Sequence, residues 1–342
     1  MGLQAGRSRC PSAVPAWRCG SLLLLGLLLS TGCRIHSSAQ TYPDRLVDSR
    51  DIGHGLIDAQ VLPNGKFVYA MSEDAGVLSV VRTSDLQLVA QIGGLSCCGG
   101  QVACSPDGRY IYATNYTDND WVAVVRTADH VVIDSLMVDG EVNGVAVSPD
   151  GKRLYMAVDA DFTFIVVARL PDNVIEDTVF VPRANGLITA LRVSPNGAHL
   201  FVGTTDESEI LSVSLPDLGL EWRVDSDLPW SGGIVVNPSG SPIYAAENSH
   251  VSARESGTGA VIDSIAFSPY VRSVDVARDG SFICVAYDAE EDKGTVAVVR
   301  TSDDSVVCVI ALPDAVYDAA PSPDGQKLYV AGGNGKLYVL GR

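Results

Sequence analysis

The chain has 342 residues and a formal net charge of −17, from 41 acidic and 24 basic residues. Hydrophobic residues make up 46% of it and charged residues only 19%, which is too apolar for a disordered chain. Its single long apolar run lies near the N-terminus, which excludes a protein with several membrane spans. The acidic balance, with no local basic stripe, argues against nucleic-acid binding.

Residues 1–32 have the features of an export signal. An apolar run at residues 21–29 is well short of the roughly 20 residues that a spanning helix needs. The basic residues before it are Arg7, Arg9 and Arg18. The next residues, LSTGC at 29–33, resemble the lipobox of bacterial lipoproteins, although Ser30 stands where that motif prefers Leu, Val or Ile. The resemblance implies a diacylglycerol on Cys33; ordinary cleavage nearby, followed by release, is the alternative.

Residues 34–44 are polar and unpatterned, which predicts a short tether. With the lipidated cysteine that the resemblance implies, residues 33–44 would connect the lipid to a domain at residues 45–342. Arg34 stands where a retention Asp would follow the cysteine in enteric bacteria. The lipoprotein resemblance therefore implies an exported protein of the bacterial cell envelope, with the outer membrane favoured over the inner one. The lipid would be its only attachment to the membrane.

A Pro-x-Gly type of turn recurs seven times after residue 60, at intervals of 40 to 46 residues. Each interval divides into four short segments of alternating polarity, which predicts four antiparallel strands. Seven such units predict an all-β chain folded as a seven-bladed β-propeller. The turn glycines are Gly65, Gly108, Gly151, Gly197, Gly240, Gly280 and Gly325.

The two ends of the domain complement each other. The last unit contains only three predicted strands, and residues 46–49 match the fourth strand of other units, at residues 132–135 and 261–264. We therefore expect the N-terminal strand to complete the last blade and close the ring, which would hide the sheet edges.

SPDG followed by IYATN, and then by a strand ending in VVRT, resembles the forty-residue YVTN repeat family of bacterial and archaeal propellers, over residues 45–342. Similar propellers include surface-layer proteins, periplasmic binding proteins, lactonases and subunits of amine and nitrite oxidoreductases, so the resemblance implies a fold rather than one activity. This chain has Arg-Thr at residues 82–83, 126–127 and 300–301, where the family usually has Ile-Asp.

The loops between second and third strands are predicted to open on one face, and they contain fourteen acidic residues against the single base Lys293. This acidic face either binds divalent cations or a basic partner, or is a solvated rim. Calcium is the kind of cofactor it suggests, although no loop follows a calcium-loop pattern. The acids are Glu73, Asp74, Asp118, Asp120, Asp159, Asp161, Asp206, Glu207, Glu209, Glu247, Asp288, Glu290, Glu291 and Asp292.

Polar residues also interrupt the predicted innermost strands, at positions five, seven or eight before the turn glycine, where other blades have small or apolar residues. We expect them to line the mouth of the axial channel. They hold a cation or a polar ligand, or else they fill the channel with salt bridges and bound water. The candidate ligand-binding residues are Asp58, Asn143, Arg192, Arg272, Asp275, Tyr317 and Asp318.

The sequence assigns no catalytic residue. It contains no Gly-x-Ser-x-Gly motif, and the absence of Cys-x-x-Cys-His excludes covalent haem. The favoured hypothesis is an envelope-anchored binding or scaffold propeller that presents its acidic face to an envelope protein or a small polar ligand. The alternative is a metal-dependent, lactonase-like hydrolase with His54 as its base. Its metal ligands would be Asp58, Asn143, Asp275 and Asp318.

Five cysteines follow Cys33. Cys97 and Cys98 are adjacent in LSCCGG and are candidates for a vicinal disulfide, which some quinoprotein propellers carry, although the tryptophan docking repeats of those enzymes are missing. Cys104 and Cys284 occupy packing positions and are predicted to be buried. Cys308 aligns with aspartates of other outer strands and is predicted to be the most exposed thiol.

Overall fold

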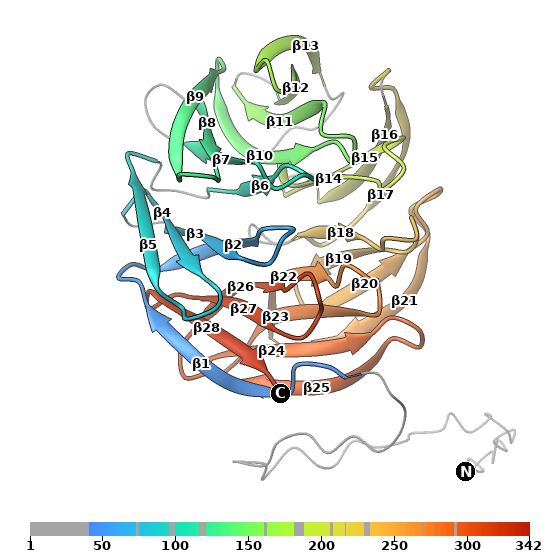
Figure 1. Cartoon of the computed structure of the whole chain (residues 1–342). Coiled ribbons are helices and arrows are strands. Elements are labelled where there is room, and N and C mark those ends of the chain that lie inside the picture. Colours follow the sequence, from blue (N-terminus) through green and yellow to red (C-terminus); the bar gives the residue numbers. More distant parts are fainter. Residues whose placement is uncertain are drawn as a thin grey trace, which may run out of the picture. The chain divides into compact units, whose positions relative to one another are not determined.

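The computed structural model describes residues 41–72, 75–95, 100–115, 121–160, 163–180, 188–205, 208–215, 217–228, 233–267, 269–290 and 293–342. These residues form seven four-stranded antiparallel sheets, which confirms the all-β, seven-bladed propeller (Figure 1). Within them, no helix is long and apolar enough to cross a membrane.

The first three blades occupy residues 56–180. Blade 1 contains β2 (Leu56–Val61), β3 (Phe67–Ser72), β4 (Val77–Arg82) and β5 (Leu88–Gly93). Blade 2 contains β6 (Val102–Cys104), β7 (Tyr110–Asn115), β8 (Trp121–Arg126) and β9 (Val131–Met137). Blade 3 contains β10 (Glu141–Val147), β11 (Arg153–Asp159), β12 (Thr163–Arg169) and β13 (Val174–Phe180).

The other four blades complete the ring. Blade 4 contains β14 (Ile188–Val193), β15 (His199–Thr204), β16 (Glu209–Ser214) and β17 (Leu220–Asp225). Blade 5 contains β18 (Ile234–Val236), β19 (Ile243–Glu247), β20 (His250–Arg254) and β21 (Val261–Ala266). Blade 6 contains β22 (Tyr270–Val276), β23 (Phe282–Glu290), β24 (Lys293–Arg300) and β25 (Ser305–Ala311). Blade 7 contains β26 (Val316–Pro321), β27 (Leu328–Gly332), β28 (Lys336–Gly341) and β1 (Arg45–Asp51).

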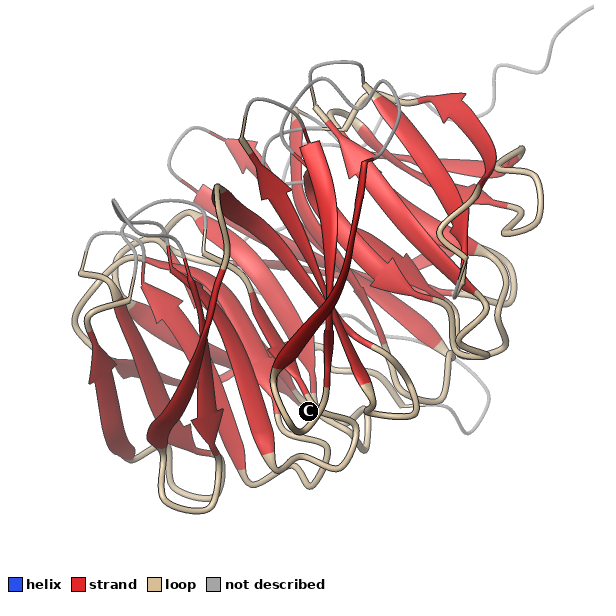
Figure 2. Ribbon diagram, turned by 90° about the horizontal axis from the view of Figure 1, so that it is seen from above, coloured by secondary structure: helices blue, strands red, loops and turns tan. Residues whose placement is uncertain are grey.

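Strand β1 closes the ring as expected. It pairs antiparallel with β28, from Arg45 opposite Gly341 to Asp51 opposite Lys336. The first strand of each blade lies innermost and the fourth outermost (Figure 1), and the strands run between two faces that carry the loops (Figure 2). Second and third strands are buried on both sides because each blade packs against two neighbours. The hydrophobic core is therefore distributed among the junctions between blades.

The seven predicted turns join first and second strands. In each, the glycine N–H donates to the carbonyl three residues earlier, at 2.7–2.9 Å. The glycine has a positive φ, +69° at Gly65, which residues with a Cβ rarely adopt. Local turn chemistry therefore fixes the repeat.

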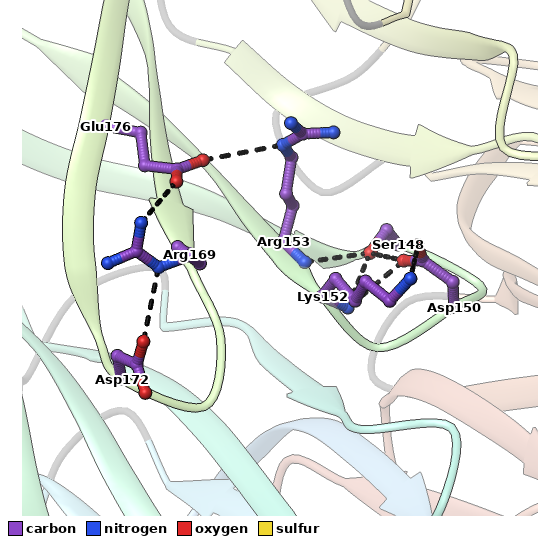
Figure 3. A network of polar contacts seen from close by, with 7 residues as sticks. All are labelled: Ser148, Asp150, Lys152, Arg153, Arg169, Asp172 and Glu176. Atoms are coloured by element: carbon purple, nitrogen blue, oxygen red, sulfur yellow. Dashed lines mark hydrogen bonds and ion pairs between the residues drawn. The ribbon is translucent and has the colours of Figure 1, made fainter.

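The unexplained Arg-Thr pairs have a structural role. The hydroxyls of Thr83, Thr127 and Thr301 donate to the carbonyl oxygens of the turn glycines in their own blades, at 2.5–2.6 Å. Each preceding arginine pairs with the aspartate three residues later, at 2.7–3.0 Å. Blade 3 has a related network, in which Arg169 pairs with Asp172 and Glu176 (Figure 3). These contacts join the outer hairpin of a blade to its inner turn.

The segment before β1 packs against blades 6 and 7. The Tyr42 side chain is 7% exposed and meets the Phe282 ring edge-on, at 5.7 Å between centroids. The Asp44 N–H donates to the Gly341 carbonyl at 2.9 Å. The prediction that Cys308 is exposed was wrong: it does lie on an outer strand, but it is 3% exposed and its Sγ lies 3.7 Å from the Asp44 carbonyl oxygen.

Candidate functional site

Five innermost strands contain a β-bulge at the same position, eight residues before the turn glycine. The register shifts there in β2, β10, β14, β22 and β26. A bulge redirects a side chain and is common beside functional sites. Three of the bulged residues, Asn143, Arg272 and Tyr317, were predicted at the channel mouth from their polar or aromatic side chains, but the bulge itself was not predicted. The bulged residues are Ile57, Asn143, Thr189, Arg272 and Tyr317.

Two axial carboxylates join successive blades. An oxygen of Asp58 in blade 1 accepts the Val102 N–H of blade 2 at 2.7 Å. An oxygen of Asp318 in blade 7 accepts the Ala59 N–H of blade 1 at 3.1 Å. Since the free edge of an innermost strand has no neighbouring strand, its N–H groups need side-chain or water acceptors. Asp58 and Asp318 therefore stabilise the two junctions that flank blade 1.

A third acid and a single base lie beside them. Asp275 accepts the N–H of the following Val276 at 2.7 Å. Arg192 is exposed, and its guanidinium makes only a 3.4 Å contact, to the Leu191 carbonyl oxygen. Among the described residues, neither forms an ion pair. The structure thus brings Asp58, Asp275 and Asp318 within electrostatic range of Arg192 without pairing them.

These carboxyl groups are harder to ionise than usual. Burial, and then repulsion from Asp318, raise the pKa of Asp58 to about 8, against the lowering effect of Arg192. Burial raises the pKa of Asp275 to about 7, again against Arg192. Burial also raises the pKa of Asp318, although the nearby Ser273 hydroxyl favours its charged form. The positive charge of Arg192 therefore does not offset the burial of these carboxyl groups, and their pKa values stay raised.

The metal-ligand set expected for a hydrolase is not assembled. No three His, Cys, Asp or Glu side chains in the described part of the chain are placed to hold one metal ion. The Asn143 side-chain nitrogen is buried without a hydrogen-bond partner. His54, the candidate base, is exposed between β1 and β2.

Arg272 and Tyr317 form a different part of the mouth. The Arg272 guanidinium carbon lies 4.8 Å from the centre of the Tyr270 ring and 5.0 Å from that of Tyr317, which is cation–π geometry. Its nitrogens pair with Asp288 at 2.8 and 2.9 Å. This arginine already has an anionic partner, whereas Arg192 has none among the described residues.

Only part of the predicted acidic face can be placed. Of its fourteen acids, the structure describes the side chains of Asp159, Glu209, Glu247 and Asp288. Glu247 is not a rim residue: it is 4% exposed and accepts from Arg254 at 2.8 Å and from Ser252 at 2.5 Å. Burial alone would raise the pKa of Glu247, but hydrogen bonds from Ser252 and Arg254 hold this pKa below its usual value. This network was not predicted from the sequence. The feature that could have indicated it is the presence of polar side chains, Ser252 and Arg254, at alternate positions of β20.

The predicted cysteine sites are described in part. Cys33, Cys97 and Cys98 lie outside the described residues, so their lipidation and pairing stay predictions. Cys284 is fully buried, as predicted, and Cys104 is partly buried. Burial raises the pKa of both thiols, which makes them poor nucleophiles.

The outer rim carries the exposed apolar surface. Fifteen large hydrophobic side chains of the described residues are exposed, and every one lies on the fourth strand of a blade. Seven of them belong to the neighbouring strands β9 and β13. These blades touch where the Asn173 amide donates to Asp134 at 2.8 Å. We call the seven the rim patch: Val131, Val132, Ile133, Met137, Val174, Ile175 and Phe180.

Comparisons with known proteins support the fold and leave the family open. No family model matches the sequence, and no curated protein matches it. Among solved structures, the chain is similar to the beta-propeller domain of Cps50 (Swd1) from Myceliophteria thermophila. The TM-score is 0.72 with 12% identity, over 87% of this chain and 99% of that one. At this identity the likeness shows that the chain is a seven-bladed propeller, a fold that commonly serves as a scaffold or binding domain.

Proposed function

We propose that this chain is a non-catalytic scaffold propeller of the bacterial cell envelope, related to the YVTN-repeat proteins and anchored by a lipid on Cys33. It docks an envelope protein on the rim patch. The observation that carries the proposal is the concentration of exposed apolar side chains on β9 and β13, where Met137 is 55% and Phe180 45% exposed. Exposed apolar side chains that gather on two neighbouring outer strands favour a protein-binding surface.

The acids beside the patch define the partner further. Asp134, Glu176 and Asp177 lie on the same two outer strands. Glu176 is partly neutralised by Arg169 at 3.0 Å and by Arg153 at 3.6 Å (Figure 3). An apolar surface with acidic neighbours on an acidic protein favours a partner that combines apolar and basic residues.

The lactonase-like alternative has less support. Asp58 and Asp318 already accept backbone N–H groups, and the described residues contain no metal-ligand group. Calcium-dependent lactone hydrolysis that is lost in Asp275→Asn would contradict the non-catalytic proposal.

Site-specific photo-crosslinking in the producing cell tests the docking surface. A photoreactive amino acid at position 133 or 175 should give one discrete protein adduct. The same amino acid at the matched outer-strand positions 220 and 261, also exposed and apolar, should not. Equal adducts at all four positions, or none at the first two, would contradict the proposal. In parallel, Cys33→Ala should move the protein from the membrane fraction to the soluble fraction.

A further inference from the structure

The axial channel contains one base and three acids that the fold brings within electrostatic range and that form no ion pair among the described residues. One oxygen of each of Asp58, Asp275 and Asp318 accepts a backbone N–H, and none of the three forms an ion pair with a described side chain. Arg192 acts on all three carboxyls electrostatically yet contacts none of them. The base and the three acids thus lie within electrostatic range of one another without forming an ion pair among the described residues.

A second observation, on the side of the channel that carries Arg192, points to a ligand. The Thr189 hydroxyl belongs to a side chain that is only 9% exposed, and it has no hydrogen-bond partner in the part of the chain that the structure describes. The Asn143 side-chain nitrogen, at the bulge of the neighbouring blade, has none either. A buried polar group without a partner costs roughly 1–3 kcal/mol, so such groups usually have a function.

The position of Gln101 shows that Thr189 borders the channel. The Gln101 amide of blade 2 donates to the Thr189 carbonyl of blade 4 at 2.8 Å. Its side-chain oxygen would lie 3.5 Å from a Cβ added at Gly144 of the intervening blade 3. The Gln101 side chain therefore crosses blade 3 on its inner edge, beside Gly144.

We propose that the axial channel binds a small zwitterion, whose ammonium group lies among Asp58, Asp275 and Asp318 and whose carboxylate pairs with Arg192. Thr189 and Asn143 donate hydrogen bonds to the carboxylate end, because Thr189 lies on the same innermost strand as Arg192. An ammonium group supplies the positive charge that the three carboxyls lack, and a carboxylate supplies the partner that Arg192 lacks. This site is independent of the rim patch.

Three probes that differ only in their charged ends test the site on the purified protein by calorimetry and thermal melting. They are 4-aminobutyrate, which has both charges, butylamine, which has only the ammonium group, and butyrate, which has only the carboxylate. We expect 4-aminobutyrate to bind and to raise the melting temperature. Each single-charge probe should bind at least ten times more weakly. No binding of 4-aminobutyrate at millimolar concentration, or equal binding of butylamine, would overturn the proposal.

Two variants assign the ends of the ligand without disturbing the blade junctions. Asp275→Asn keeps an oxygen for the Val276 N–H but removes the charge, and Arg192→Gln changes an exposed side chain. Each should weaken 4-aminobutyrate binding at least tenfold, and neither should alter the circular dichroism spectrum. Arg50→Gln, another exposed arginine but on β1, is the matched control and should bind as the unmodified protein does. Unchanged affinity in both channel variants would overturn the assignment.

Discussion

The axial channel and the outer half of blade 5 both bury carboxyl groups, with opposite results. In the channel, burial raises the pKa of Asp275 to about 7, and among the described residues its carboxylate accepts only the adjacent backbone N–H and forms no ion pair with Arg192. In blade 5, Glu247 accepts from Ser252 and Arg254, and its pKa is lowered although burial alone would raise it. The comparison teaches that burial raises the pKa of both acids, and that hydrogen bonds and an ion pair to a buried carboxylate can reverse this effect.

The largest expected effect comes from breaking the satisfied pair. Arg254→Met should lower the free energy of unfolding by about 3–5 kcal/mol, because it leaves Glu247 charged and buried without its cation. Urea denaturation measures this. The control is Arg223→Met, which removes a partly exposed arginine 3.6 Å from Glu209 and should cost about 1 kcal/mol or less. Similar losses in the two variants would show that the Glu247 network is no more important than a surface pair.

Neutralising one acid in each region should change the free energy of unfolding in opposite directions. At pH 8, Asp275→Asn should raise the free energy of unfolding by about 1–2 kcal/mol, since it removes a charge that the channel does not compensate. Glu247→Gln should lower it by about 1.5–3 kcal/mol, since it weakens two charge-assisted hydrogen bonds. Two changes of the same sign would contradict the account.

The pH dependence of stability follows from the raised pKa values. Between the usual pKa of an aspartate, 3.8, and about 7–8, the folded channel binds more protons than the unfolded chain does. The free energy of unfolding should therefore fall as the pH rises from 5 to 8, by about 1 kcal/mol or more from the channel acids alone.

Other groups also titrate in this range, so the difference between two proteins is the informative quantity. The lowered pKa of His130, caused by burial, works in the opposite direction. Denaturation of the unmodified protein and of Asp275→Asn at each pH isolates the channel. The stability difference should widen as the pH rises from 5 to about 7, level off above the raised pKa, and vanish only at or below the usual aspartate pKa of 3.8. A difference that does not change with pH would be inconsistent with a raised pKa.

The smallest effects distinguish an unpartnered hydroxyl from a partnered one. Thr189→Val should leave stability unchanged or increase it by up to about 1 kcal/mol, because no hydrogen bond is lost. Ser252→Ala should cost about 1–3 kcal/mol, because it removes the Ser252–Glu247 bond. Thermal melts of the two variants provide the comparison, and a clear loss in Thr189→Val would show that this hydroxyl has a structural partner.

The blades and their closure were predictable because they rest on local turn chemistry, repeated at every glycine from Gly65 to Gly325. The contacts in the channel were not. Asp318 accepts the N–H of Ala59, 259 residues away, and this contact exists only once the ring has closed.

The interpretation of Cys308 failed for a similar reason. Its position on an outer strand was evident from the repeat, but the covering segment with Tyr42 lies at the other end of the chain. Likewise, the repeat placed Glu247 in a loop, whereas its burial depends on Ser252 and Arg254 in the next strand.

The most direct test of the contrast between the two regions is a carboxyl ¹³C NMR titration of the protein labelled at aspartate and glutamate side chains. The spectra of Asp275→Asn and Glu247→Gln assign the two resonances. We predict that Asp275 titrates near pH 7 and that Glu247 titrates below the usual range of a glutamate. Titration of both groups in their ordinary ranges would contradict the account.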